Sequence, residues 1–301
     1  MRVLITGSNG LLGQKLVQLI LEKGDELIAT ARGENRLPIP EEDYSYHSMD
    51  ITNKEQVLKV IGEVKPDVVI HTAAMTNVDQ CETEREACWK LNVDAVEYII
   101  EACEATGAYL VHLSTDFIFD GEAGPYDEEA TPNPVSYYGD SKLAAEKLLF
   151  DSDIKYGIAR TVLVYGIAHD MSRSNIILWV KGSLEAGKDI KVVDDQLRSP
   201  TLAEDLAIGC YLMAEKRAEG VFNISGKDLL TPFDMAVKTA DFFKLDTSTM
   251  TRADASSFTQ TAKRPPKTGF NIDKAKEELG YAPRSFNEGI SILADQMGFS
   301  R

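Results

Sequence analysis

A tyrosine and a lysine stand four residues apart in the stretch 136–142, which reads Ser-Tyr-Tyr-Gly-Asp-Ser-Lys. On an α-helix, residues i and i+4 lie on one face, and the sequence predicts a helix over 136–150. A positive charge beside a phenol favours the phenolate, so Lys142 is expected to lower the pKa of Tyr138. Such a tyrosine is suited to general acid–base chemistry. Because Tyr-x-x-x-Lys is frequent by chance, the pair gains meaning only from other motifs.

A second candidate group follows a buried strand predicted over 109–114. That strand ends in Ser114-Thr115-Asp116. In a doubly wound α/β fold, small polar residues at the carboxyl end of a strand face the ligand cleft. The Thr115 hydroxyl could there hydrogen-bond a substrate carbonyl, and Tyr138 could give a proton to the same oxygen. Thr115, Tyr138 and Lys142 are therefore the candidate catalytic residues.

A glycine-rich turn lies between a strand predicted over 2–6 and a helix predicted over 11–22. Residues 7–13 read Gly-Ser-Asn-Gly-Leu-Leu-Gly. This spacing, directly after an apolar strand, is typical of a dinucleotide site in which the helix N-terminus faces the pyrophosphate. The next strand ends in Thr30-Ala31-Arg32-Gly33 without the carboxylate that binds the ribose of NAD. Arg32, helped by Arg36, suits a 2′-phosphate, so NADP is favoured and NAD is kept as possible. The alternative is that Arg32 is a solvated cation.

Strands and helices alternate through the first half of the chain, which predicts a Rossmann-type, doubly wound parallel sheet. After about residue 166 the alternation changes, which predicts a smaller α+β domain for the substrate. We expect residues 1–165 to form the NAD(P)-binding domain, joined by about 195–222, and 166–301 to be mostly substrate-binding. Further predicted segments are helices over 54–64, 84–106, 175–186, 202–216 and from 231, strands over 26–30, 68–71, 157–164, 190–193 and 220–224, an irregular stretch over 248–268, and a final helical hairpin.

Composition narrows the class of protein. The chain has 301 residues, and its formal charge of −16 disfavours nucleic acid and anionic membrane surfaces as partners. Four cysteines lack metal-ligand spacing, and reduced thiols suit a cytoplasmic protein. No apolar run is long enough for a membrane span, and no signal peptide is expected. Acidic pairs such as Glu41-Glu42 and Asp194-Asp195 could hold Mg²⁺, but solvated acidic faces are the more usual reason for them.

Together these motifs resemble the extended short-chain dehydrogenase/reductases. More narrowly, several segments resemble the dTDP-4-dehydrorhamnose reductase family and span nearly the whole chain. They are Ala73-Ala74 followed by Val78-Asp79, 114–121 (STDFIFDG), 138–142 (YGDSK), 195–201 (DQLRSPT) and Arg264-Pro265.

The resemblance implies an NADPH-dependent reduction at C4 of dTDP-4-dehydrorhamnose, giving dTDP-L-rhamnose, with Tyr138 as the acid. Asp116 would join Thr115 beside the sugar as a fourth catalytic residue, and Asn92 would support proton transfer through Lys142. The implied cofactor residues are Gly7, Asn9, Gly10, Leu11, Leu12, Gly13, Arg32, Asp50, Ile51, Ala73, Ala74, Asn92, Tyr138 and Lys142; the implied substrate residues are Thr76, Asp116, Arg198 and Arg264.

Other members of the superfamily remain as alternatives. The 4,6-dehydratases place a glutamate base where this chain has Phe117, so dehydration is disfavoured. Epimerases share the tyrosine and lysine but commonly use NAD, against which Arg32 argues mildly. The regulatory subunit of methionine adenosyltransferase also resembles this family and would bind NADP without turnover. The superfamily commonly dimerises through the helices expected over 84–106 and 136–150, so a homodimer is possible.

The chain also departs from the reductase pattern at two positions. The family usually has Gln where this chain has Leu11, and Gly where it has Arg198. Arg198 is either a surface side chain or an added contact to a phosphate or carboxylate of the substrate.

Overall fold

A parallel sheet is the centre of the molecule in the computed structural model, which describes residues 1–171 and 174–299. Within these residues seven strands pair in the order β10-β6-β5-β4-β1-β2-β3, and every pairing is parallel. The strands are β1 (Arg2–Thr6), β2 (Glu26–Ala31), β3 (Ser45–Ser48), β4 (Val68–His71), β5 (Tyr109–Thr115), β6 (Tyr156–Thr161) and β10 (Gly220–Asn223).

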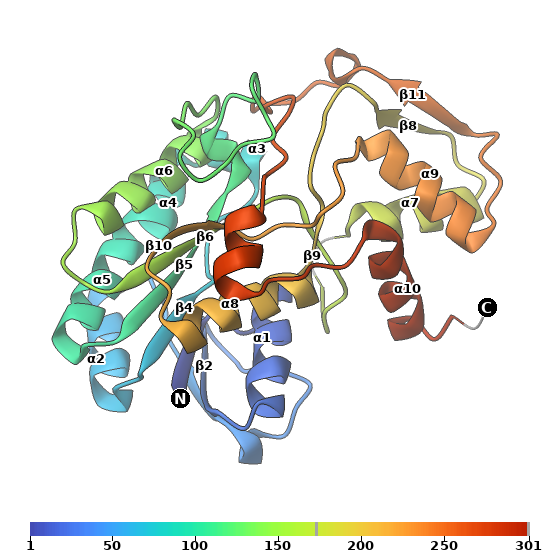
Figure 1. The fold of residues 1–301 in the computed structure, drawn as a ribbon. Helices are drawn as coiled ribbons and strands as arrows, with labels where there is room; N and C mark the ends of the chain where they lie inside the picture. The colour runs from blue at the N-terminus through green and yellow to red at the C-terminus, as the bar shows by residue number, and fades with distance from the viewer. Residues whose placement is uncertain (172–173, 300–301) are drawn as a thin grey trace.

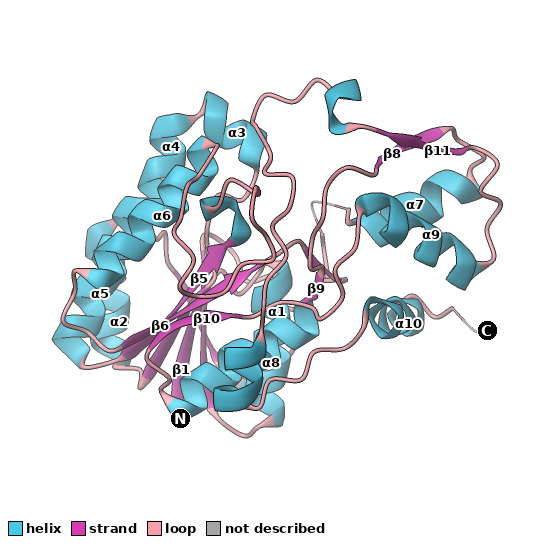
Figure 2. Cartoon of the chain, turned by 45° about the horizontal axis from the view of Figure 1, so that its top comes forward, coloured by secondary structure: helices cyan, strands magenta, loops and turns pink. Residues whose placement is uncertain are grey.

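Helices cover both faces of this sheet (Figures 1 and 2). On one face, α2 (Lys54–Val64), α5 (Ala95–Thr106) and α6 (Tyr137–Phe150) bury apolar side chains against the strands. On the other face, α1 (Leu11–Glu22) and α8 (Ala203–Lys216) pack on the sheet and on each other. The predicted Rossmann-type fold is therefore confirmed.

The remaining elements form two smaller apolar cores beside the sheet, drawn on the right of Figure 1. They contain α7 (Ile176–Glu185), α9 (Pro232–Phe243) and α10 (Phe286–Gln296), with a parallel pair of β8 (Ile190–Val193) and β11 (Met250–Ala253). A second short pair, β7 (Val164–Tyr165) and β9 (Thr201–Leu202), connects this part to the sheet part. The division into a cofactor domain and a substrate domain stays a proposal.

Local sequence signals explain where several helices begin. Asn53, Asn77, Ser136 and Asn175 each accept a backbone N–H from the first turn of their helices. Two helices have full capping boxes, formed by Thr231 with Asp234 in α9 and by Ser285 with Glu288 in α10.

Several local predictions differ from the structure. The expected helix over 84–106 consists of α4 (Arg85–Trp89), a π-helical turn η2 (Lys90–Asp94) and α5. The short helix α3 (Val78–Thr83), β3 and β11 were not expected; the last lies in the stretch expected to be irregular. The final helical hairpin is wrong, because the π-turn η5 (Ala275–Leu279) packs on α8 whereas α10 belongs to a separate apolar core. Short 3₁₀ turns are η1 (Glu41–Asp43), η3 (Asp116–Ile118) and η4 (Ala255–Ser257).

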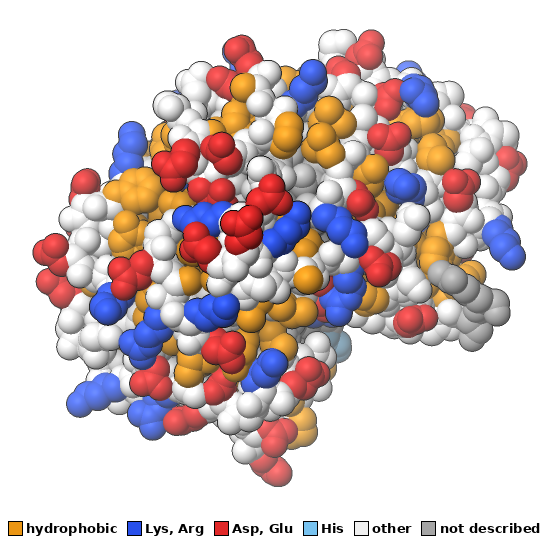
Figure 3. All heavy atoms as spheres, in the orientation of Figure 1, with side chains coloured by type: hydrophobic (Ala, Val, Ile, Leu, Met, Phe, Trp, Pro, Cys, Tyr) orange, Lys and Arg blue, Asp and Glu red, His pale blue; other side chains and the backbone are white. Residues whose placement is uncertain are grey.

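The surface agrees with the acidic composition. On the face that Figure 3 shows, Lys and Arg side chains are interspersed with Asp and Glu side chains. No helix in the described part of the chain combines the length and the apolar character needed to cross a membrane.

Candidate active site

The predicted site residues of the first half follow the carboxyl ends of neighbouring strands. The glycine turn follows β1, Arg32 follows β2, Asp50 and Ile51 follow β3, and Ala73, Ala74 and Thr76 follow β4. Thr115 ends β5. Because the strands are parallel, these ends meet at one edge of the sheet, where ligands bind in doubly wound folds. The fold thus gathers residues that are more than a hundred positions apart.

The glycine turn has the features that a dinucleotide pyrophosphate requires. A Cβ atom on Gly13 would lie 2.2 Å from the carbonyl oxygen of Gly7, so only glycine lets α1 approach the turn this closely. Gly10 is the N-cap of α1 and no side chain caps that helix. The Ser8 hydroxyl is buried there without a hydrogen-bond partner. An uncapped helix N-terminus and an unsatisfied donor both fit phosphate oxygens.

Asn9 of the glycine turn and the loop after β2 form the expected ribose side of the cofactor site. Asn9 holds this loop, because its amide donates to the carbonyl of Glu34 at 2.9 Å and its oxygen accepts the Arg36 N–H at 3.0 Å. Arg32 is exposed, and Arg36 pairs with Asp170 at 3.4 Å. An exposed guanidinium beside a pinned loop fits a 2′-phosphate. Leu11 and Leu12 begin α1, so their side chains add no polar group to the site.

Helix α6 brings Tyr138 to the end of β5 through a close backbone approach. A Cβ atom on Gly139 would lie 2.2 Å from the carbonyl oxygen of Phe117. Further along α6, Glu146 forms a buried, bidentate ion pair with Arg160 of β6, at 3.0 and 2.7 Å. Such a pair fixes geometry because either charge alone would be unsatisfied in the interior. The helix is therefore held against the sheet at both places.

Tyr138 lies near Thr115, the last residue of β5, and against the ring of Phe117. The Thr115 side chain is a polar neighbour that acts to lower the pKa of the Tyr138 hydroxyl, and the Phe117 ring meets the Tyr138 ring edge-on with centroids 5.7 Å apart. Burial raises the pKa of Tyr138 well above its ordinary value. The structure thus differs from the expected lowering by Lys142, because desolvation of the phenolate outweighs nearby polar groups. Tyr138 is held in its protonated form, which is the form a proton donor needs.

Lys142 is buried, and its ammonium group lies beside a histidine. Its Nζ is 3.3 Å from Nε2 of His112. Burial lowers the pKa of Lys142 to about 8, although Glu146 opposes this shift. His112 pairs in register with His71 on β4, and their rings stack 5.5 Å apart. Burial also holds the pKa of His112 well below 6.5, so the ring is neutral and can accept from the lysine. The sequence motifs gave no signal for His112; only the strand register places it here.

Asn92 lies in the π-helical turn η2. Its side-chain oxygen accepts the Met75 N–H at 2.8 Å, and its amide donates to the Met75 carbonyl at 3.1 Å and to Ser141 Oγ at 3.0 Å. Cys88 lies 3.5 Å from the same amide and from Ser141. Asn92 therefore joins α6 to the loop after β4. The one-residue excess of a π-turn gave no sequence signal.

The four expected substrate residues differ in their exposure and in their bonding partners. Thr76 is exposed in the loop after β4. Asp116 is buried and accepts hydrogen bonds from Thr115 and Thr268. Arg264 forms a bidentate pair with Asp79 at 2.7 and 3.2 Å. Arg198 is 5% exposed and donates to carbonyl groups of its own chain. The alternative that Arg198 is a surface side chain is wrong.

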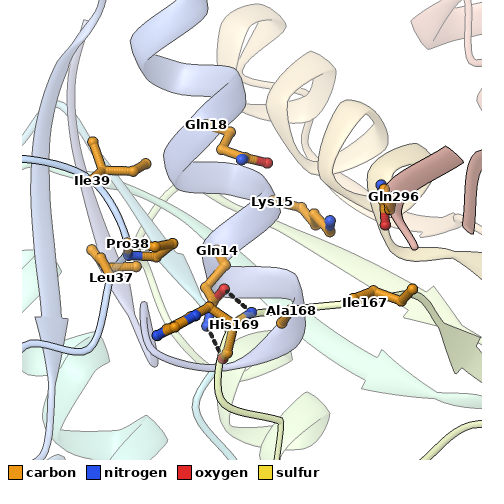
Figure 4. A pocket seen from close by; sticks show the side chains of 10 residues that line it. All are labelled: Gln14, Lys15, Gln18, Leu37, Pro38, Ile39, Ile167, Ala168, His169 and Gln296. Carbon is orange, nitrogen blue, oxygen red and sulfur yellow. Dashed lines mark hydrogen bonds between the residues drawn. The ribbon is translucent and has the colours of Figure 1, made fainter. Parts of the chain in front are cut away.

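A pocket of about 300 Å³ lies beside α1 (Figure 4). Its lining residues are Gln14, Lys15, Gln18, Leu37, Pro38, Ile39, Ile167, Ala168, His169 and Gln296. Gln14 exchanges two hydrogen bonds with the backbone of His169, at 3.0 and 2.8 Å. None of the residues expected in catalysis or substrate binding lines this pocket, so we place the candidate active site at Tyr138.

The acidic pair Asp194-Asp195, which could hold Mg²⁺, has other partners. Asp194 pairs with Arg252 at 2.6 Å, and Asp195 accepts the Ala255 N–H at 3.1 and 3.0 Å. Within the described residues, no group of three or more His, Cys, Asp or Glu side chains is arranged to hold a metal ion.

Comparison with known proteins decides the family. Residues 1–298 match the model of the family described as "RmlD substrate binding domain". The chain belongs to this family. It is 30% identical to the dTDP-4-dehydrorhamnose reductase of Aggregatibacter actinomycetemcomitans, over 97% of this chain and 98% of that protein. It is also 30% identical to methionine adenosyltransferase 2 subunit beta of Bos taurus, over 96% and 86%.

Solved structures of the family share the whole fold. A dTDP-4-dehydrorhamnose reductase of Clostridium acetobutylicum aligns with a TM-score of 0.87 at 31% identity, covering 99% of this chain and 100% of that chain. The Bacillus anthracis enzyme, in complex with NADP, aligns with a TM-score of 0.83 at 28% identity, covering 98% and 99%. The predicted family and fold are confirmed. The prediction of an NAD(P)-dependent oxidoreductase is confirmed at the level of the family.

Proposed function

We propose that this protein is an NADPH-dependent reductase of a nucleotide sugar, and that it reduces the C4 ketone of dTDP-4-dehydrorhamnose to give dTDP-L-rhamnose. The observation that carries the proposal is the buried Thr115–Tyr138 pair, at the same sheet edge as an uncapped glycine turn. Family relatives named as dTDP-4-dehydrorhamnose reductases support the choice of substrate. One of them, solved in complex with NADP, supports the choice of cofactor.

The cofactor would be held by the glycine turn at the pyrophosphate and by Arg32 at the 2′-phosphate. Asp50, Ile51, Ala73 and Ala74 would line its path along the sheet edge. When bound, NADPH supplies the hydride that reduces the ketone. NAD remains a second possibility, because only Arg32 and Arg36 argue for the phosphorylated form.

Side chains of the protein then supply the proton and stabilise the anion that remains. Tyr138 donates its phenolic proton to the ketone oxygen as the alkoxide forms. The Thr115 hydroxyl donates to Asp116, so its oxygen stays beside the phenol as an acceptor that helps to position it. The ammonium of Lys142, one turn further along α6, would stabilise the phenolate that remains. Phe117 packs edge-on against the phenol and offers no base, which disfavours elimination.

A second candidate function is regulation of a partner enzyme, as in the relatives named as methionine adenosyltransferase 2 subunit beta. It would use the same cofactor site without turnover. The epimerase alternative has weaker support, since an NAD-bound UDP-glucose 4-epimerase shares the fold at 22% identity and shares nothing further that bears on the reaction.

A turnover assay separates these functions. The purified protein is mixed with NADPH and dTDP-4-dehydrorhamnose, and loss of NADPH absorbance is followed. We expect steady oxidation that falls by about 10²- to 10⁴-fold in Tyr138→Phe, with NADPH binding unchanged. Tight NADPH binding without oxidation on this or any other 4-keto nucleotide sugar would refute the reductase. Specific binding to a methionine adenosyltransferase catalytic subunit would then support the regulator.

Two further parts of the proposal concern the cellular location and the oligomeric state of the protein. We propose a cytoplasmic location, supported by four cysteines that are all free thiols. We also keep the homodimer as a proposal, through α4, α5 and α6. Light scattering of the purified protein tests it directly.

A further inference from the structure

A segment far along the chain from the glycine turn is held beside the candidate site by hydrogen bonds and an ion pair. Residues 262–268, which we call the strap, lie between the sheet part and the smaller part. At one end, Arg264 and the Ala262 N–H bind the Asp79 carboxylate, the latter at 2.9 Å. At the other end, the Thr268 hydroxyl donates to Asp116. The strap therefore reaches the carboxylate that adjoins Thr115.

Arg198 holds the middle of the strap. Its guanidinium donates to the carbonyl groups of Pro265 at 2.6 Å and Pro266 at 3.0 Å. It also donates to the Leu197 carbonyl at 2.8 Å and the Gln196 side chain at 3.1 Å. These four bonds use the planar geometry of arginine, which a lysine cannot reproduce. Four of the five N–H donors of the side chain are thus committed to its own chain, so a bidentate phosphate contact would require at least one of these bonds to break.

Asp116 is the point at which the strap meets the catalytic residues. One carboxylate oxygen accepts from Thr115 at 3.1 Å and the other accepts from Thr268. An ionised carboxylate can only accept, so it fixes the direction of both hydroxyl groups. A protonated carboxyl would donate to one of them and release its orientation. The side chain of Thr115 is also a polar neighbour that influences the pKa of Tyr138.

The charges around Asp116 explain why Arg198 matters to it. Asp116 is buried, and burial raises the pKa of its carboxyl group, while the positive charge of Arg198 opposes that rise. Thr268 of the strap, Thr115 of β5 and Tyr138 of α6 are the polar groups that also face it. Arg264 faces Arg198 from the strap. Arg198 is therefore the cation that favours the acceptor form of this carboxylate.

We propose that Arg198 is a positioning residue for the reduction: its charge and its bonds to Pro265 and Pro266 keep Asp116 as the acceptor that orients Thr115 beside Tyr138. This inference rests on the proposed reductase function for its kinetic part only. It also gives a role to a residue for which the sequence left two interpretations open.

The first test measures Asp116 directly and needs no substrate. Protein labelled with ¹³C at the aspartate carboxyl groups is titrated by NMR, and the Asp116 signal is assigned by its loss in Asp116→Asn. We expect Arg198→Met to move the Asp116 titration up by about one pH unit or more, whereas Arg198→Lys, which keeps the charge, moves it less. Arg264→Met is the matched control, because it loosens the strap at Asp79 and leaves the charge beside Asp116. An unchanged titration in Arg198→Met, or an equal shift in Arg264→Met, would overturn the proposal.

The second test is the pH dependence of kcat/KM with NADPH and the keto sugar. The acidic limb should move to higher pH in Arg198→Met, and the same substitution should cause no such move when Asp116→Asn is already present. A shift that persists in the double variant would contradict the proposal. If the unmodified protein shows no turnover, the proposed function fails, and the NMR titration still decides the role of Arg198. Arg198→Lys serves both tests if Arg198→Met does not fold.

Discussion

The ammonium group of Lys142 lies 3.3 Å from the ring nitrogen Nε2 of His112, and both side chains are buried. The lysine thus has a neutral acceptor in the interior where its charge is costly. This relationship links the stability of the protein to the group that the proposed reaction needs.

Replacing Lys142 with methionine should stabilise the fold while removing activity. The unfolded chain holds the lysine proton up to about pH 10.5 and the folded chain only up to about pH 8, so the unfolded state binds more protons between these values. Stability therefore rises with pH across that window, and below about pH 8 the burial penalty is fully present. We expect Lys142→Met to gain on the order of 1–3 kcal/mol at pH 7 and nothing above about pH 10.5. Urea unfolding at the two pH values measures this, and equal gains at both would contradict it.

Removing His112, the acceptor for Lys142, should change the pH dependence of NADPH binding. His112→Leu leaves the ammonium without a partner, which lowers the pKa of Lys142 below about 8. NADPH affinity should then weaken at a lower pH than in the unmodified protein. His112→Gln retains an acceptor oxygen and is the matched control. Fluorescence titration of NADPH against pH checks the result; identical profiles for the two variants would rule out the role of the acceptor.

Substitution by alanine should destabilise the protein at Gly13 and stabilise it at Gly62. In Gly13→Ala the new methyl group would meet the Gly7 carbonyl at 2.2 Å, so we expect a loss of about 1–3 kcal/mol and weaker NADPH binding. Around Gly62, in α2, an added Cβ meets nothing within 4 Å. Gly62→Ala should therefore gain about 0.5–1 kcal/mol. Thermal unfolding with and without NADPH compares them, and a tolerated Gly13→Ala would argue against the tight turn.

The preference for NADPH should depend on Arg32. This side chain is exposed and follows β2, where it can meet a 2′-phosphate. We expect Arg32→Ala to raise the KM for NADPH by about tenfold or more, since a lost charge-assisted bond is worth about 1.5–3 kcal/mol. The KM for NADH should change little. Arg36→Ala, measured in parallel, reports how much the second guanidinium adds. An unchanged ratio of the two KM values in Arg32→Ala would refute the preference.

The sequence predicted the structure best where short-range pattern and spacing determine the local fold. The glycine turn, the alternation of strands and helices, and the end of β5 all follow from short-range rules, and the structure has them where they were expected. The polar strand β3 was missed because its edge position requires little apolar character. The final hairpin was wrong because helical periodicity does not tell which core a helix joins.

The electrostatics of the site could not be predicted from spacing alone. The four-residue interval between Tyr138 and Lys142 says which face they share but says nothing about desolvation. Burial proved to be the dominant influence on both groups, and it raises one pKa while lowering the other. The partners His112 and Thr268 come from distant parts of the chain, so only the tertiary structure could reveal them.

The π-turn at Lys90–Asp94 has a consequence for how this chain could vary. Such a turn contains one residue more than the α-helical turn it replaces. Deletion of a single residue there would restore regular helix between Arg85 and Thr106 and would remove the widened turn that sets the direction of the side chains within it. The Asn92 amide would then leave Ser141 and the Met75 backbone. A one-codon loss could therefore produce a descendant that keeps the sheet and the nucleotide turn but has lost the link between α6 and the loop after β4.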